Sequence, residues 1–225
     1  MIKAISFDFW GTLAVHNPEY SIARTAYLAD LFGLTSEEAD ARYKSIKRAY
    51  DYQATNFGTA TTPIVAVKRL IEGMRLTRPT NAVEIMRDLA ALARRHLPIL
   101  GKDINAALNV AANHFTLCIT SNTNFIGGDT LRRVLVGIPI THYGFSDEVG
   151  LSKPDSDFFR TTMCGAQRVL PALRAHEMVH IGDHEICDIK GAKKVGMEAI
   201  FVTDPDHTAS TVRNLVKTHS GANKA

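Results

Sequence analysis

The stretch AISFDFWGTLAVHN, at residues 4–17, opens with an apolar run that stops at an acidic residue, Asp8. The strand predicted here, from Ile2 to Phe9, carries apolar side chains on both of its faces. This pattern is typical of a strand that is buried between two layers of helices in a parallel sheet. The stretch therefore favours an α/β fold and leaves a carboxylate at the end of a buried strand.

Helical patterns follow from about Glu19 to about Leu97, with no comparable strand among them. Helix starts in this block are marked either by the spacing of a capping box or by a proline in the first turn. These starts are Thr35 with Glu38, Asn81 with Glu84, and Thr62 with Pro63. The sequence thus predicts a helical insertion after the first strand.

Strands and helices alternate after about residue 102. We expect strands at 115–121, 142–146, 178–183 and 198–204, and helices at 103–112, 128–136, 155–169, 187–196 and 208–218. Such alternation implies right-handed crossovers and a doubly wound parallel sheet.

The composition is that of an ordinary globular protein, with 45% hydrophobic and 22% charged residues in a chain of 225. Its net charge is only +3, and the basic residues are spread along the chain, so no nucleic-acid partner is expected. The three cysteines form no CxxC pair, which argues against a zinc site and against a disulfide framework.

The N-terminal apolar run is interrupted by Asp8, so it lacks the continuous core of a signal peptide. No apolar stretch approaches the length that spans a membrane. We therefore expect a cytoplasmic protein without a membrane partner, and the sequence makes no prediction of its oligomeric state.

Polar residues follow the predicted strands in four places: Asp8 with Thr12, Ser121 with Asn122, Lys153 in GLSKPD, and Asp183 with Asp188 in GDHEICD. Each of them alone has an ordinary structural explanation, such as a helix cap, a turn or a surface lysine. Functional groups of an open parallel sheet gather beyond the carboxyl ends of its strands. The four segments together therefore indicate one site.

These segments resemble the motifs of the haloacid dehalogenase-like (HAD) superfamily. DFWGTL is similar to its first motif, ITSN to its second, the lysine of SKPD to its third, and GDHEICD to its fourth. The resemblance implies a Rossmann-like core at residues 1–15 and 98–225. It also implies a helical cap of the C1 type at residues 16–97, which closes over the site and selects the substrate.

The same residues suit phosphoryl transfer. The carboxylate of Asp8 would attack a phosphoryl group and form an aspartyl phosphate. Because a phosphate dianion repels a carboxylate, the reaction needs cations, namely Mg²⁺ on hard oxygen ligands and the ammonium of Lys153. The expected metal residues are Asp8, Asp183, the carbonyl of Trp10 and, through water or its neighbours, Asp188. The expected phosphate-binding residues are Ser121, Asn122, Lys153, Gly11 and Thr12, and the expected catalytic residues are Asp8, Lys153 and Ser121.

Trp10 departs from the resemblance, which implies a second aspartate at this position as general acid and base. An indole donates a hydrogen bond but does not exchange a proton at neutral pH. Acid–base assistance is worth roughly 10²–10⁴-fold. We therefore expect weak activity, or a preference for good leaving groups such as acyl or aryl phosphates. His16 is a substitute acid or, by default, only a polar residue at the junction with the helical block.

Three functions remain open. The first is a Mg²⁺-dependent phosphohydrolase that acts on a small phosphorylated metabolite. The second is a phosphate-binding or slowly self-phosphorylating protein with little turnover. The third is a 2-haloacid dehalogenase, a branch in which an aromatic tyrosine replaces the second aspartate. Against the third, Asp183 and Asp188 make a cation site from which a halide pocket gains nothing.

Overall fold

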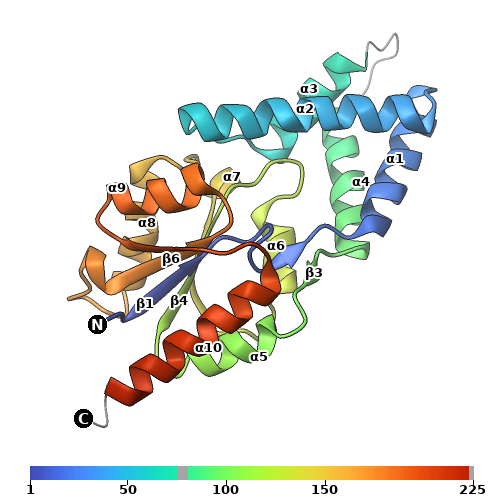
Figure 1. Ribbon diagram of the computed structural model, residues 1–225. Coiled ribbons are helices and arrows are strands. Elements are labelled where there is room, and N and C mark those ends of the chain that lie inside the picture. Colours follow the sequence, from blue (N-terminus) through green and yellow to red (C-terminus); the bar gives the residue numbers. More distant parts are fainter. Residues whose placement is uncertain (75–80, 223–225) are drawn as a thin grey trace.

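The computed structural model describes residues 1–74 and 81–222. Its main sheet has five parallel strands in the order β5-β4-β1-β6-β7 (Figure 1). The strands are β1 (Ala4–Phe7), β4 (Thr116–Ser121), β5 (Ile140–Phe145), β6 (Met178–Gly182) and β7 (Glu198–Phe201). The predicted Rossmann-like parallel sheet is confirmed.

Helices cover both faces of this sheet. One layer contains α5 (Ile104–Ala111) and α10 (Pro205–Ala222), which lie side by side, and the other contains α8 (Ser156–Gln167) and α9 (Gly191–Lys194) (Figure 1). Along β1, Ile5 and Phe7 enter the cluster under α5 and α10, whereas Ala4 enters the cluster under α8 and α9. Alternate side chains of a strand point to opposite faces, so a strand between two helical layers is buried throughout.

The segment between β1 and β4, the next strand of the main sheet along the chain, is mostly helical, as expected. It contains α1 (Pro18–Phe32), α2 (Ser36–Phe57), α3 (Pro63–Gly73) and α4 (Ala82–Arg95). These helices share their own apolar cluster, around Leu28, Tyr43, Leu70 and Leu89. The boundaries of a separate domain at 16–97 stay a prediction, and residues 75–80 of that range lie outside the described residues.

All three predicted helix starts are confirmed. Thr35 forms a complete capping box with Glu38, and Pro63 lies in the first turn of α3. Asn81 is the N-cap of α4, as predicted, but its side chain accepts a hydrogen bond from the amide of Val83 and not from that of Glu84, so the cap is not a capping box.

Several short elements differ from the expectation. An antiparallel ribbon of β2 (Ala14–Val15) and β3 (Ile99–Leu100) joins the helical block to the sheet, and it was not predicted. The helix expected at 187–196 begins with a π-helical segment, η2 (Glu185–Lys190). The short helices α7 (Ser146–Val149) and η1 (Ala175–Glu177) were not predicted either, whereas α6 (Gly128–Val134) corresponds to the helix expected at 128–136.

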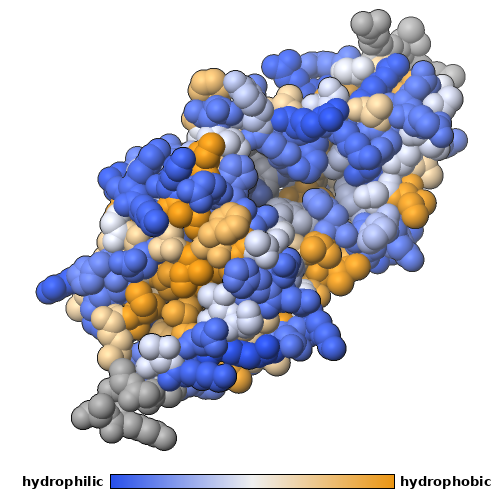
Figure 2. Space-filling view, in the orientation of Figure 1, coloured by the Kyte–Doolittle hydropathy of each residue, from blue (hydrophilic) through white to orange (hydrophobic). Residues whose placement is uncertain are grey.

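On the face shown in Figure 2, the surface over α1 to α4 is mostly hydrophilic, whereas apolar residues are exposed over the part that contains the sheet. Within the described ranges, none of the helices combines the length and apolar character that crossing a membrane requires.

Candidate active site

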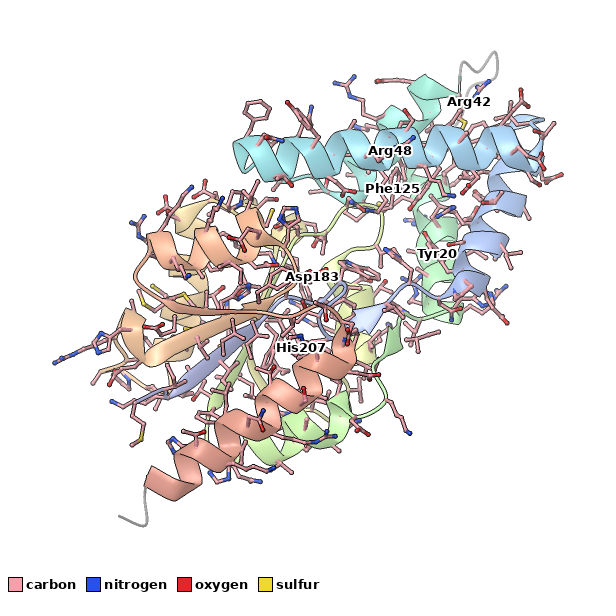
Figure 3. All side chains as sticks on the ribbon, viewed as in Figure 1. Tyr20, Arg42, Arg48, Phe125, Asp183 and His207 are labelled. Carbon is pink, nitrogen blue, oxygen red and sulfur yellow. The ribbon has the colours of Figure 1, made fainter. Side chains whose placement is uncertain are left out.

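The predicted site residues meet at the carboxyl ends of the strands. Phe7 of β1 is level with Ile119 of β4 and with Ile181 of β6, so the residues that follow these three positions lie at one edge of the sheet. The amide of Asp8 donates to the carbonyl of Ile181 at 2.9 Å. Figure 3 shows Asp183 at this end of the sheet, on the side that faces α2.

The ammonium of Lys153 lies at the centre of the cluster. Its Nζ is 2.5 Å from Asp8 Oδ1 and 2.6 Å from Asp188 Oδ1, and its side chain is 2% exposed. Burial alone would lower the pKa of Lys153, but the carboxylates of Asp188 and Asp8 outweigh burial and raise it. Lys153 therefore holds a positive charge directly against Asp8.

Asp183 adds a third carboxylate to the two that contact this ammonium. Asp8, Asp183 and Asp188 each offer an oxygen within 4.8 Å of the others. Burial raises the pKa of Asp8 even though Lys153 opposes the shift, and burial together with the charges of Asp8 and Asp188 raises the pKa of Asp183 to about 7. A cluster of three carboxylates with one ammonium has an excess of negative charge. An all-oxygen donor set of this kind suits Mg²⁺.

Both carboxylate oxygens of Asp188 already have protein partners. Oδ1 lies 2.6 Å from Lys153 Nζ and 3.1 Å from His180 Nε2, and Oδ2 accepts from the amide of His184 at 2.8 Å. Burial would raise the pKa of Asp188, but Lys153 and His180 outweigh it and lower that pKa. Asp188 is therefore a fixed anion behind Lys153, which matches an indirect part in metal binding better than a direct one.

Gly11 brings the first loop against Asp183. Its φ of 72° lies in the left-handed region, which favours glycine. A Cβ at this position would lie 2.2 Å from Asp183 Oδ2. Gly11 thus leaves room for the carboxylate of Asp183, a predicted metal ligand, and its part in phosphate binding stays a prediction.

Asn122 holds the main chain of Lys153. Its Nδ2 donates to the carbonyl of Lys153 at 3.0 Å, and its Oδ1 accepts from the amide of Lys153 at 2.8 Å. Both ends of the side-chain amide are occupied by these bonds. The structure therefore gives Asn122 a positioning contact that the sequence did not suggest.

A cavity of about 280 Å³ opens beside the cluster. Six of the predicted residues line it, namely Asp8, Trp10, Asn122, Lys153, Asp183 and Asp188. The other three predicted residues, Ser121, Gly11 and Thr12, are not among the described residues that line it. Ser121 is fully buried, and its Oγ lies 3.5 Å from the carbonyl oxygen of Asn122. Phosphate binding by Ser121 and Thr12 stays a prediction.

The opposite wall of the cavity comes from α2. Its residues include Tyr43, Lys47, Asp51 and Thr55. Lys47 Nζ lies 2.6 Å from Asp51 Oδ2, and Asn124, in the loop after β4, donates to Asp51 Oδ1 at 3.1 Å. None of these four residues was predicted as a site residue, because the tilt of α2 over the sheet decides which of its sides faces Asp8.

Trp10 and His16 form an aromatic stack that lines the same cavity. Their ring centroids are 4.2 Å apart, and the planes differ by 18°. Burial lowers the pKa of His16 to about 4, and the nearby cations Lys47 and Arg24 add to this effect. His16 is therefore neutral at pH 7 and lacks the acidic proton of an imidazolium, which argues against its use as the substitute acid.

Comparison with known proteins yields matches of two kinds, of which the first is in sequence. Residues 150–222 match a family model described as HAD-hydrolase-like. A phosphoserine phosphatase from Thermus thermophilus is 36% identical over 78 residues, which are 33% of this chain and 29% of that protein. The chain thus matches less than a third of the length of this relative.

The second kind is in structure. A HAD phosphatase from Thermococcus onnurineus has a TM-score of 0.66 at 20% identity, and the match covers 96% of this chain and 98% of that one. A 2-haloacid dehalogenase from Pseudomonas syringae has a TM-score of 0.65 at 21% identity, covering 89% and 86%. Because a phosphatase and a dehalogenase share this fold, the fold does not choose between their chemistries.

Proposed function

We propose that this chain, which belongs to the haloacid dehalogenase-like superfamily as its four motifs predicted, is a Mg²⁺-dependent phosphohydrolase. The observation that carries the proposal is the buried ammonium of Lys153, 2.5 Å from Asp8 Oδ1. An ammonium in this position offsets the repulsion between a carboxylate nucleophile and a phosphate dianion.

The reaction divides into two displacements at phosphorus. In the first, an oxygen of Asp8 bonds to phosphorus while the bond to the leaving-group oxygen breaks, which gives an aspartyl phosphate. In the second, water hydrolyses that acyl phosphate, releases inorganic phosphate and restores the carboxylate of Asp8. Lys153 neutralises charge on Asp8 and on the phosphoryl oxygens in both steps.

Asp8, Asp183 and the carbonyl of Trp10 would hold Mg²⁺, with Asp188 acting through Lys153 and water. When bound, the metal supplies positive charge next to the phosphoryl oxygens. The excess of carboxylates over cations in the cluster supports this assignment.

The missing acid limits the leaving group. Trp10 does not exchange protons, and His16 is neutral at pH 7 because its pKa is lowered to about 4. A leaving group that is stable as an anion needs no proton, so we propose acyl or aryl phosphates as substrates. The cavity of about 280 Å³ suits a small molecule.

We propose the helical block at 16–97 as the cap of this site. The support is that α2 supplies Tyr43, Lys47, Asp51 and Thr55 to the wall opposite Asp8. We also propose a cytoplasmic location, with no nucleic-acid or membrane partner. The free thiols of Cys118, Cys164 and Cys187 fit a reducing compartment.

The test is p-nitrophenol release from p-nitrophenyl phosphate, with and without Mg²⁺. We expect turnover in the wild type with Mg²⁺, and loss of it without the metal or in Asp8→Asn and Asp183→Asn. Turnover that persists in folded Asp8→Asn would overturn the assignment of the nucleophile.

A protein that is phosphorylated but turns over slowly is the second candidate. It is favoured by the Trp10–His16 stack, which lines the cavity where an acid and base would otherwise act. A phosphoenzyme that accumulates from acetyl phosphate, with negligible release of phosphate, would establish it. A 2-haloacid dehalogenase would instead release chloride from 2-chloropropionate without a metal.

A further inference from the structure

A chain of buried polar groups runs through the sheet and ends at the candidate site. It links α8, β4, β1 and β6 through four side chains with no exposed surface. The successive distances are 2.8 Å from Thr162 Oγ1 to Thr120 Oγ1, 2.7 Å from there to Ser6 Oγ, 3.0 Å from Ser6 Oγ to His180 Nδ1, and 3.1 Å from His180 Nε2 to Asp188 Oδ1.

This chain of polar side chains lies in the buried centre of the sheet, where apolar side chains are the rule. Ser6 and His180 are register partners on adjacent central strands, and their neighbours on this side of the sheet include Phe159, whose ring lies edge-on to His180 at 5.1 Å. Apolar residues would fill this position without any need for partners, because a buried polar group is costly unless it is hydrogen-bonded. The polar groups here are all paired, and the last of them reaches Asp188.

We propose that His180 is a positioning residue for the Asp188–Lys153–Asp8 array, an inference that rests on the proposed function. His180 supplies one of the three donors around the Asp188 carboxylate, beside Lys153 Nζ and the His184 amide. The carboxylate in turn fixes the ammonium that lies 2.5 Å from Asp8. Mutation of a group that orients a direct ligand in this way typically lowers activity or metal affinity by about 10–100-fold.

Hydrogen-bond chemistry assigns the tautomer of the His180 ring. An ionised carboxylate only accepts, so Nε2 must carry the hydrogen that points at Asp188. In a neutral ring Nδ1 then accepts, and the hydroxyl of Ser6 is its donor at 3.0 Å. The bond from Ser6 thereby favours the tautomer whose N–H points at Asp188. Because the hydroxyl hydrogen of Ser6 is used in this bond, the hydroxyl of Thr120 is the donor in the bond between Thr120 and Ser6.

The kinetic test compares two variants of similar size at one position. The amide of His180→Gln can donate near the place of Nε2, whereas the side chain of His180→Met cannot. We expect His180→Met to lower kcat for p-nitrophenyl phosphate by about 10–100-fold with little change in KM, and His180→Gln to recover most of that loss. Both variants should lose thermal stability. Equal kcat in the two folded variants, whatever their stabilities, would overturn the positioning role.

A matched control removes the far end of the chain. Thr162→Val deletes the hydroxyl most distant from Asp188 and should reduce stability while kcat stays within about twofold. A loss of kcat in Thr162→Val as large as that in His180→Met would mean that general loosening of the core, and not His180, causes both effects.

A second readout needs no turnover. With ¹⁵N-labelled histidine, assigned by difference from His180→Gln, the wild-type spectrum should show a protonated Nε2 and an unprotonated Nδ1 at His180. A hydrogen on Nδ1 alone would overturn the proposal even in an active enzyme. The expected tautomer in a protein without phosphatase activity would instead count against the proposed function and leave the bond to Asp188 standing.

Discussion

The ammonium of Lys153 lies 2.5 Å from Asp8 Oδ1, although the two residues are 145 positions apart in the sequence. Strand β1 delivers the carboxylate, and Asn122 holds the main chain that carries the ammonium. On the other side, Asp188 balances the charge of Lys153. We therefore expect both the stability and the activity of the protein to depend on the buried charges of Lys153, Asp8 and Asp188.

Lys153→Met should destabilise the protein. It leaves the buried carboxylates of Asp8 and Asp188 without their cation, and breaking a buried ion pair in this way typically costs about 3–5 kcal/mol. The measurement is the free energy of unfolding in urea. The cost should be smaller in an Asp8→Asn background, since one of the stranded charges is then absent. Equal costs in the two backgrounds would show that Lys153 and Asp8 are not coupled.

Gly11→Ala should raise the Mg²⁺ concentration needed for half-maximal activity. The new Cβ would lie 2.2 Å from Asp183 Oδ2, so this carboxylate has to move. Gly33→Ala is the matched control, because Gly33 also has a positive φ, of 61°, but no atom within 4 Å of a built Cβ. Both variants should lose about 1–3 kcal/mol to backbone strain. An unchanged Mg²⁺ requirement in Gly11→Ala would mean that Asp183 does not bind the metal.

The effect of Mg²⁺ on stability should grow with pH. The pKa of Asp183 is raised from 3.8 to about 7, chiefly by burial and then by the charges of Asp8 and Asp188. Since the folded state binds the extra proton between these values, the metal-free protein loses this contribution to stability as pH rises from about 4 to 7. Melting temperatures with and without Mg²⁺ should therefore differ more at pH 8 than at pH 6. In Asp183→Asn the effect of Mg²⁺ on the melting temperature should no longer differ between pH 6 and pH 8. A larger Mg²⁺ effect at pH 6 than at pH 8 in the wild type would contradict the assignment of Asp183 as a metal ligand.

Trp10→Asp should raise the turnover of alkyl phosphates more than that of aryl phosphates. A carboxyl group at this position would protonate a poor leaving group, and such assistance is worth roughly 10²–10⁴-fold. The ratio of the two kcat/KM values measures the effect, with Trp10→Phe as the variant that removes the indole without adding an acid. No gain in a folded Trp10→Asp protein would mean that the missing acid does not limit this enzyme.

The parallel sheet and its polar edge followed from the sequence because local patterns determine them. The strand at Met178–Gly182 is an unbroken apolar run apart from His180, and Asp183 comes directly after it. Since parallel strands end at one edge, Asp8 and Asp183 were expected to meet.

Other features depend on distances that the sequence does not encode locally. The bond between His180 and Ser6 joins residues 174 positions apart and depends on the register of two strands. The ribbon of β2 and β3 has two residues per strand, too few for a periodic pattern. Phosphate binding by Asn122 stays a prediction, whereas the bonds of its side-chain amide to the backbone of Lys153 join residues 31 positions apart and were not predicted.

The most direct test of the central claim is to look for the phosphoryl group on Asp8. The protein would be mixed with Mg²⁺ and acetyl phosphate, quenched in acid, digested and analysed by mass spectrometry, with Asp8→Asn treated in parallel. We predict one added phosphoryl group on the wild-type peptide that contains Asp8, and none on the same peptide of the variant. Release of phosphate by a wild-type protein whose Asp8 is never phosphorylated, or the same modification on Asp8→Asn, would contradict the account.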